Sequence, residues 1–534
     1  MASFTALPSW KWDVPEFFNI GVACTDAHLG TPVEIRVAMI VEDDALGTSS
    51  ITYGELAERT GRFAQLLQHL GVKAGERVLV RLPNSIDYPT AFLGAVKQGA
   101  IAVPTSTLLT ADEVRYLVED SGAAAIVIDK AGWEAIGTRL EGAGKLKHVI
   151  LGGEQLESKL ATIAATAPAH RTRADDPAYL VYTSGTTGFP KGVLHAHRSL
   201  IGRSPASTYW FDFDSKQSDR IMHSGKFNWT YVLGSALMDP LYRGKTVIAH
   251  EGRNDASTWP RLIAKHGATI FIGVPTIYRQ ILQKTAFTKA DVPTLRHCMS
   301  AGEHLSDEVF ALWQERFGLD IYEAVGMSEF SYYLSQSKLR PIRPGSAGFP
   351  QPGHEVRLLD PETLVEAKPG DEAMICIAES DPGLFLEYWN LPEETAKLRH
   401  DGWFFTGDYA RYDADGYLWF LGRKDDIIKS FGYRVSPYEV ERVMKSHPEV
   451  ADCACIAEEA GADKRLVVTY VIAQPGSSVT PDELLAFGRE RLAAYKAPKI
   501  VYLARDFPRT RNGKILRREI TPQIATARSA TQAF

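Results

Sequence analysis

The sequence predicts an α/β protein with a large N-terminal domain of parallel-rich sheets and helices, a small antiparallel subdomain, and a small α+β C-terminal domain. Short apolar runs such as AAAIVID (123–129) and ATIFIGVP (268–275) recur along the chain, and amphipathic helical patterns separate them. Buried parallel strands have such continuous apolar runs, and helices connect them. After about Ser346 the pattern changes to short strands with Gly/Asp turns, which predicts the antiparallel part.

The N-terminal elements are expected in alternation. Residues 53–72 carry apolar side chains at helical spacing and end near Gly71, as a helix does. Apolar runs then predict strands within the segments 77–84, 123–129, 147–152, 178–185, 245–252 and 268–275. Ligands of parallel sheets bind at the loops beyond the carboxyl ends of strands. The segments that follow these runs are therefore candidate binding loops.

The C-terminal third has a different pattern of expected strands and helices. Strands are expected in the segments 353–360, 372–378, 401–413 and 415–426, followed by helices over 437–446 and 481–494 and by strands around 453–459 and 466–472. The charged segment LGRKDD marks the boundary of a unit long enough to fold alone. We expect a large domain over residues 1–424, with its antiparallel subdomain at 345–424, and a small domain over residues 425–534.

Composition excludes several classes of function. The 534 residues contain 59 Lys and Arg against 65 Asp and Glu, and this net charge of −6 argues against a nucleic-acid-coating surface. The start lacks a signal-peptide pattern, and no apolar run approaches the ~18 residues of a membrane helix. We expect a cytoplasmic protein with neither nucleic-acid nor membrane partners. Cys453 and Cys455, like His195 and His197, lack further metal ligands nearby in sequence and are expected to be structural.

One polar segment, YTSGTTGFPKG (182–192), follows an apolar run. Its small residues let the backbone approach an anion, its hydroxyls donate hydrogen bonds, and Lys191 adds a positive charge. This composition predicts a polyphosphate-binding loop, with an ordinary solvated loop as the alternative. The segment lacks the Gly-Lys-Ser/Thr ending of a Walker A loop.

The same segment resembles the phosphate loop of the AMP-forming adenylating superfamily, which includes acyl-CoA synthetases, luciferases and the adenylation domains of peptide synthetases. Five further segments are similar to motifs of this family and follow in the family's order: SAGEHL (300–305), YEAVGMSE (322–329), WFFTGD (403–408), GRKDDIIKSFGYRVSPYEVE (422–441) and PRTRNGKILRREI (508–520). Within the superfamily the chain is most similar to the benzoate-CoA ligase and medium-chain acyl-CoA synthetase branches.

The resemblance implies a role for individual residues. Lys514 would bridge the carboxylate and the α-phosphate, Glu329 would bind Mg²⁺, and Ser328 stands where the family has a catalytic Thr. Val325 replaces an adenine-stacking Tyr, so stacking is not expected there. The residues implied to contact ATP, with Asp408 and Arg423 at the ribose, are Thr183, Ser184, Gly185, Thr186, Thr187, Gly188, Lys191, Ala301, Gly302, Glu303, Glu323, Ala324, Val325, Gly326, Met327, Asp408 and Arg423.

The acid would bind beside the segment 223–244. The spacing K-x-x-x-x-Y-x-x-G from Lys226 to Gly234 resembles benzoate-CoA ligases. Aromatic side chains there imply a short pocket for a small aromatic, alicyclic or short-to-medium-chain acid, although the same residues would also suit an ordinary core. The expected pocket wall consists of Trp229, Tyr231, Val274, Gly302, Val325 and Tyr332.

The implied function is an AMP-forming carboxylic acid–CoA ligase that uses ATP, Mg²⁺ and CoA. In this family the small domain is mobile and rotates about a hinge, here Asp425. The rotation exchanges the Lys514 loop for a CoA-binding face, here Lys429, Ser430, Phe431, Gly432, Tyr433 and Arg434. A stand-alone adenylating enzyme with a carrier-protein acceptor and a non-catalytic nucleotide-binding module are the alternatives. A homodimer and regulatory acetylation of Lys514 are further hypotheses.

Overall fold

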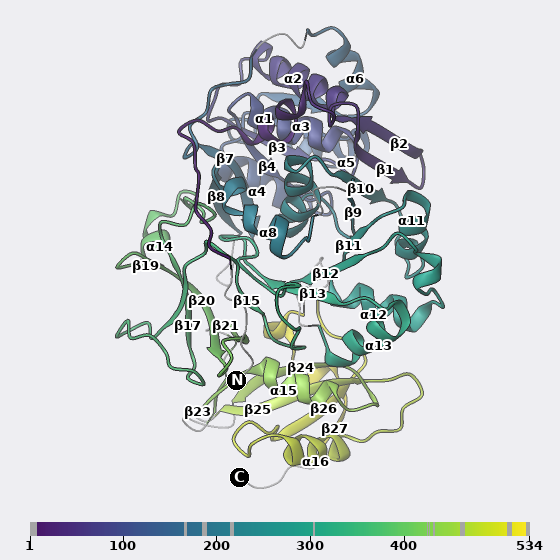
Figure 1. Ribbon diagram of the computed structural model, residues 1–534, viewed down its shortest axis with the longest axis vertical. Coiled ribbons are helices and arrows are strands. Elements are labelled where there is room, and N and C mark those ends of the chain that lie inside the picture. The colour runs from purple at the N-terminus through teal and green to yellow at the C-terminus, as the bar shows by residue number, and fades with distance from the viewer. Residues whose placement is uncertain are drawn as a thin grey trace.

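The computed structural model describes residues 8–164, 168–183, 190–213, 218–302, 305–423, 426, 428–430, 433–459, 465–509 and 515–529. It confirms the predicted fold class. A large N-terminal domain fills the upper part of Figure 1, and a smaller C-terminal domain lies below it. The predicted boundary follows β21 (Leu418–Arg423). The predicted hinge Asp425 lies outside the described residues, so the domain boundary stays a prediction.

The first sheet is parallel through its centre. Among the described residues it has nine strands, in which β13 to β1 run parallel and the outer strands β15, β14 and β2 run antiparallel. In spatial order they are β15 (Phe349–Pro350), β14 (Leu334–Ser335), β13 (Ile321–Val325), β12 (His297–Ala301), β11 (Ile270–Ile272), β9 (Arg220–His223), β10 (Thr246–Glu251), β1 (Val37–Asp43) and β2 (Gly47–Thr52).

The second sheet has the same character. Seven strands of the described chain form it, with a parallel centre and an antiparallel edge made by β8 and β18. In spatial order they are β18 (Glu387–Tyr388), β8 (Lys191–Ala196), β7 (Pro177–Thr183), β4 (Ile101–Pro104), β3 (Arg77–Arg81), β5 (Ala125–Ile128) and β6 (His148–Leu151). The predicted strand segments therefore form strands of two separate sheets.

Helices pack between the sheets and on their outer faces. The hydrophobic cluster between the sheets contains α1 (Ile20–Cys24), α2 (Tyr53–His69) and α3 (Asp87–Lys97). Helices α4 (Ala111–Ser121) and α5 (Lys130–Leu140) cover the second sheet, while α11 (Thr258–His266), α12 (Pro275–Lys284) and α13 (Asp307–Phe317) cover the first. The shorter helices include α6 (Glu154–Ala161), α7 (Ser199–Gly202), α8 (Ser204–Tyr209), α10 (Asp239–Tyr242) and α14 (Pro392–Ala396).

Local sequence explains where the first long helix begins and ends. Thr52 and Glu55 form a reciprocal capping box at the start of α2. The helix was expected to end near Gly71; its last residue is His69, and Gly71 has φ +79°. A left-handed residue cannot continue a right-handed helix, and glycine adopts that conformation without strain.

The antiparallel subdomain and the C-terminal domain also form as predicted. The subdomain sheet contains β16 (Val356–Leu359), β17 (Ala373–Ala378), β20 (Trp403–Tyr412), β19 (Arg399–His400) and β21. The C-terminal domain contains the hairpin β22 (Ile428–Ser430) and β23 (Tyr433–Val435), the mixed sheet β24 (Val450–Glu459), β25 (Arg465–Ala473), β26 (Ile500–Ala504) and β27 (Ala525–Arg528), and helices α15 (Pro437–Lys445) and α16 (Pro481–Arg491). Cys453 and Cys455 are fully buried in the core of this domain, as expected.

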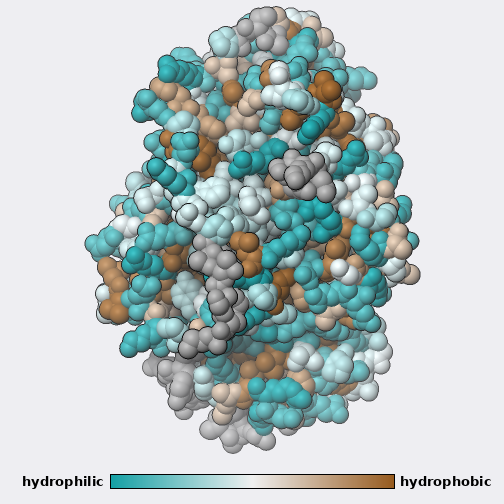
Figure 2. Space-filling model, viewed as in Figure 1, coloured by the Kyte–Doolittle hydropathy of each residue, from teal (hydrophilic) through white to brown (hydrophobic). Residues whose placement is uncertain are grey.

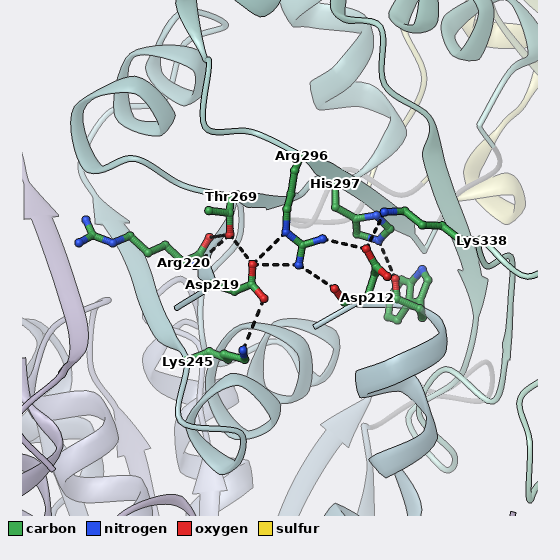
Figure 3. A network of polar contacts seen from close by, with 9 residues as sticks. Asp212, Asp219, Arg220, Lys245, Thr269, Arg296, His297 and Lys338 are labelled. Atoms are coloured by element: carbon green, nitrogen blue, oxygen red, sulfur yellow. Dashed lines mark hydrogen bonds and ion pairs between the residues drawn. The ribbon is translucent and has the colours of Figure 1, made fainter. Parts of the chain in front are cut away.

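A polar network ties together the amino ends of three strands of the first sheet (Figure 3). The carboxylate of Asp219, which precedes β9, is fully buried and accepts hydrogen bonds from Arg296 Nε at 3.0 Å and Thr269 Oγ1 at 2.9 Å. Arg296 precedes β12 and also contacts Asp212, which in turn accepts from Lys338. Because the strands are parallel, this network holds the end of the sheet opposite to their carboxyl ends.

The surface is mixed in polarity. On the face shown in Figure 2, hydrophobic side chains are interspersed with hydrophilic ones. Within the described ranges, no helix combines the length and the apolar character that crossing a bilayer requires.

Candidate active site

A cavity of about 830 Å³ lies where the carboxyl ends of β12 and β13 face the C-terminal domain. Gly302 follows β12, and the turn 326–329 follows β13. The opposite wall comes from the C-terminal domain and includes Tyr438, Glu439 and Arg442 of α15. The cavity therefore lies between the two domains, at the strand ends where ligands of parallel sheets bind.

All the described residues predicted for ATP, catalysis and the acid, apart from Lys191, line this one cavity. They come from segments far apart in sequence, and two groups, expected for ATP and for the acid, meet there. The lining residues that were predicted are Thr183, Trp229, Tyr231, Val274, Ala301, Gly302, Glu323, Ala324, Val325, Gly326, Met327, Ser328, Glu329, Tyr332, Asp408 and Arg423.

The predicted phosphate loop connects two antiparallel strands. Thr183 at the end of β7 pairs with Lys191 at the start of β8, so the connection is a hairpin rather than a strand-to-helix turn. Thr183 lines the cavity. The residues between, Ser184, Gly185, Thr186, Thr187 and Gly188, lie outside the described part of the chain, and so does Glu303.

Lys191 has two partners that the sequence did not reveal. Its ammonium Nζ lies 3.0 Å from Glu394 Oε2 and 5.4 Å from the centre of the Tyr388 ring. The hydrogen bonds from Lys397 and Lys191 hold the pKa of Glu394 down at about 2, so this carboxylate is charged throughout the neutral range. A phosphate that binds Lys191 would compete with Glu394 for it.

The segment that carries Ser328 and Glu329 is held from two sides. His195 Nε2 lies 2.7 Å from the carbonyl oxygen of Ser328, and burial lowers the pKa of His195 to about 3. The imidazole is therefore neutral and donates from Nε2, because a carbonyl oxygen can only accept. Tyr388 Oη donates to Glu329 Oε1 at 2.5 Å. His195 is thus a structural residue that fixes the backbone of the site.

Glu323, which lines the cavity, has a carboxyl group with a raised pKa. Its Oε1 accepts a hydrogen bond from Leu305 N at 2.9 Å, and its backbone N–H donates to Gln336 Oε1. Burial raises the pKa of Glu323 to about 8, with Asp307 adding to the increase. The side chain is therefore largely protonated at neutral pH and able to donate a hydrogen bond from its O–H.

Asp408 and Arg423, the residues expected at the ribose, are cross-strand neighbours on β20 and β21. Arg423 Nε lies 3.5 Å from Asp408 Oδ1, with 9% of the aspartate side chain exposed. The pair faces the cavity. The two side chains form an ion pair with each other at the cavity wall.

The predicted acid pocket is an aromatic part of the same cavity. Trp229 and Tyr231 pack edge to face with their ring centres 5.4 Å apart, and a Cβ on Gly302 would lie 3.7 Å from the Trp229 ring. The helix that follows Trp229 is irregular, because α9 (Thr230–Val232) continues into a π-helical turn, η2 (Leu233–Met238). Such turns often occur at functional sites. The aromatic side chains narrow this part of the cavity.

The described part of the predicted CoA-binding segment forms the hairpin β22–β23. Ser430 is buried, and its Oγ donates to Arg465 O at 2.7 Å within the C-terminal domain. Lys429, Tyr433 and Arg434 belong to the same hairpin. Phe431, Gly432, Asp425 and Lys514 lie outside the described residues. Among the described residues, the C-terminal domain lines the cavity with side chains of α15 and with Ser446, Leu492 and Lys496.

Sequence reasoning missed several residues of the site. Tyr388 and Glu394 contact the predicted residues Glu329 and Lys191 directly, but lie in an ordinary strand and helix whose sequence carries no separate signal. The residues on α15 were also missed, because only the arrangement of the two domains brings them to the cavity.

The fold and this cavity define a two-domain protein with its candidate site at the domain interface. Comparison with known proteins agrees. Residues 34–389 match the family model of the AMP-binding enzymes, and residues 439–514 match the model of the AMP-binding enzyme C-terminal domain. The chain belongs to the AMP-binding enzyme family, as predicted.

Three relatives illustrate the similarity. A benzoate–CoA ligase from Thauera aromatica is 34% identical over 89% of this chain and 90% of its own length. The mitochondrial acyl-coenzyme A synthetase ACSM3 of Mus musculus is 30% identical over 88% of this chain and 83% of its own length. ATP-bound MatB from Rhodopseudomonas palustris superposes with a TM-score of 0.85 at 29% identity, covering 94% and 97% of the two chains. These relatives confirm the predicted enzyme class, an AMP-forming acid–thiol ligase that uses ATP, Mg²⁺ and CoA.

The described residues of the cavity suit a Mg²⁺ ion that binds mainly through the phosphates of a substrate. Glu329 contributes a carboxylate that is 8% exposed at the cavity wall. In the described part of the chain there is no group of three or more His, Cys, Asp or Glu side chains that could hold a metal ion alone. Mg²⁺ commonly binds through one or two carboxylates plus substrate phosphates. Glu329 is thus suited to hold the ion together with ATP, where the ion would neutralise charge on the phosphates.

Proposed function

We propose that this chain joins a small aromatic, alicyclic or short-to-medium-chain carboxylic acid to coenzyme A. The acid and ATP would form acyl-AMP and pyrophosphate, and CoA would then displace AMP to give the thioester. The observation that carries the proposal is the interdomain cavity, which is lined by the whole described part of the predicted ATP set apart from Lys191, and by the whole predicted acid-pocket set.

The aromatic part of the cavity supports an acid of limited length. Trp229, Tyr231 and Tyr332 surround it, and Trp210 packs against both tyrosines from behind, at ring-centre distances of 6.2 and 4.9 Å. A flat ring or a short alkyl chain would pack against such faces. Two of the relatives named above are a benzoate–CoA ligase and an acyl-coenzyme A synthetase, which is compatible with either kind of acid.

The roles of the site residues are part of the proposal. Bringing a carboxylate to ATP opposes two negative charges, so cations and N–H donors must offset the repulsion. Lys191 would bind the phosphates once Glu394 releases it, Lys514 would bridge the carboxylate and the α-phosphate, and Asp408 would accept hydrogen bonds from the ribose.

The second step needs the other face of the small domain. Thioester formation would follow a rotation of the domain that starts near residue 425, which would bring the hairpin with Lys429 and Arg434 to the cavity. Residues 1–424 and 425–534 are the two units that this rotation would separate. We further propose a cytoplasmic location, where ATP and CoA are available, a homodimeric assembly, and regulation by acetylation of Lys514, which would remove its charge.

The test is carboxylate-dependent ATP–pyrophosphate exchange, followed by CoA thioester formation. A panel of benzoates, cyclohexane carboxylates and C3 to C10 acids should contain at least one that supports both reactions. Exchange without thioester formation would favour a stand-alone adenylating enzyme with another acceptor. ATP binding without exchange for any acid would favour a nucleotide-binding module and defeat the ligase proposal.

The variant Lys514→Ala separates the two steps. It should lose exchange but still form the thioester from supplied acyl-AMP, because the second step would use the other face of the small domain. Asp425→Pro should behave in the opposite way, since a rigid hinge keeps adenylation and blocks rotation. Equal loss of both steps in each variant would contradict the assigned roles.

A further inference from the structure

Tyr388 lies between two charged groups of the site, and the backbone around it is firmly held. Strand β18 pairs with β8, the strand that returns from the glycine-rich loop, so that Tyr388 is opposite Val193. Trp389 N donates to Gly192 O at 2.8 Å, and Tyr388 N donates to Thr395 Oγ1 at 2.9 Å. Tyr388 is only 8% exposed. Its side chain therefore projects from a fixed point between the loop strand and the antiparallel subdomain.

The hydroxyl of Tyr388 engages one oxygen of Glu329. Its Oη donates to Oε1 at 2.5 Å, and Phe385 N donates to the carbonyl oxygen of Glu329 at 2.9 Å. An ionised carboxylate can only accept a hydrogen bond, so the Tyr388 hydroxyl is the donor. A hydrogen bond to a charged acceptor is stronger than one between neutral groups. It fixes the orientation of the carboxylate and leaves Oε2 for a cation.

The ring of Tyr388 borders the positive group. Lys191 Nζ lies 5.4 Å from the ring centre, within the range of a cation–π contact, while Glu394 holds the same ammonium from another side. One side chain thus contacts the carboxylate suited to a divalent cation through its hydroxyl and the loop cation through its ring.

We propose that Tyr388 is a positioning residue that aims Glu329 at a divalent cation and holds Lys191 beside the phosphates. The identity of the ligand, Mg·ATP, rests on the proposed function, whereas the two contacts belong to the chain itself. A hydrogen-bonding partner of a metal-ligating carboxylate typically changes metal affinity by about 10–100-fold when removed. Phenylalanine would keep the ring and remove the hydroxyl, and leucine would remove both.

The experiment measures ATP binding rather than turnover. Isothermal titration gives the dissociation constant of ATP in EDTA and in saturating Mg²⁺, and the ratio of the two constants measures how much the cation tightens binding. Tyr388→Phe should lower this ratio by about 10-fold or more and leave the affinity in EDTA unchanged. Tyr388→Leu should lower both. Tyr417→Phe is the matched control. It also removes a hydroxyl, which donates to the backbone carbonyl of Pro341 at 2.7 Å, and Tyr417 does not line the cavity.

A second comparison separates positioning from a general loss of structure. In a Glu329→Gln background, Tyr388→Phe should not lower the ratio further, because the hydroxyl would act through that carboxylate. Three results would each overturn the proposal. The ratio in Tyr388→Phe could equal that of the wild type, or Tyr388→Phe could lower the ratio as much in the Glu329→Gln background as in the wild type. The ratio of the wild type itself could also be near one, which would mean that Mg²⁺ does not tighten ATP binding. Failure of pyrophosphate exchange in the wild type would defeat the proposed function without changing the ratio, so the two failures are distinguishable.

Discussion

The buried carboxyl group of Glu323 gives a stability prediction with a defined sign. Its pKa is about 8 in the folded protein against an ordinary 4.5. Between these pH values the folded protein holds a proton that the unfolded chain has lost, so stability falls as the pH rises through this window. Each pH unit costs about 1.4 kcal/mol, so the loss between pH 5.5 and 7.5 is on the order of 2–3 kcal/mol. Glu323→Gln removes this cost and keeps an oxygen to accept from Leu305 N.

The assay is urea unfolding of wild type and Glu323→Gln at both pH values, followed by tryptophan fluorescence. All other groups titrate alike in the two proteins, so the difference between their unfolding free energies isolates Glu323. The variant should gain on the order of 2–3 kcal/mol relative to wild type on going from pH 5.5 to 7.5. A difference that is the same at both pH values would refute the claim that Glu323 is protonated in the folded protein.

Three further perturbations follow from the described contacts. Glu394→Gln frees Lys191 from its ion pair and should tighten ATP binding, measured by titration in EDTA. Asp219→Asn removes the charge from a fully buried carboxylate with cationic partners and should lower the unfolding free energy by about 3 kcal/mol, measured in urea. Gly326→Ala should abolish pyrophosphate exchange, because the added Cβ would lie 2.1 Å from Tyr332 N and displace the turn that carries Glu329.

Matched controls make these outcomes decisive. Glu393→Gln changes the neighbouring glutamate and should leave ATP binding unaltered, and equal effects at both positions would contradict the competition between Glu394 and phosphate. Gly54→Ala adds a methyl group whose nearest contact is the flexible Glu34 side chain at 3.2 Å, so it should keep exchange activity. Wild-type stability of Asp219→Asn would show that the network in Figure 3 does not hold the strand ends.

The fold was predictable because its signals are local. Apolar runs of strand length, helical periodicity and capping residues such as Thr52 are all read within a few residues, and the elements formed where they were expected. Helix ends were less accurate: the helix starting at Pro481 ends at Arg491 rather than at residue 494. The sequence also did not show that the strands divide between two sheets, because strand pairing depends on contacts between distant segments.

The site was predictable in its motifs but not in its supporting contacts. The residues matched to family motifs converge on one cavity. The partners of Lys191 and Glu329 were not foreseen, since Glu394 is 203 residues from Lys191 and Tyr388 is 59 residues from Glu329. Ser430, assigned to CoA binding by its motif, is buried against Arg465 in this arrangement. Motif position gives a residue type, whereas tertiary packing decides what that residue contacts.

The central claim is that the interdomain cavity activates a carboxylic acid with ATP. ATP–pyrophosphate exchange, measured with and without each acid of the panel in the presence of Mg²⁺, tests it most directly. We expect exchange that depends on a small aromatic, alicyclic or short-to-medium-chain acid and is lost in Lys514→Ala. The absence of acid-dependent exchange with every acid, from a folded protein that binds ATP, would contradict it.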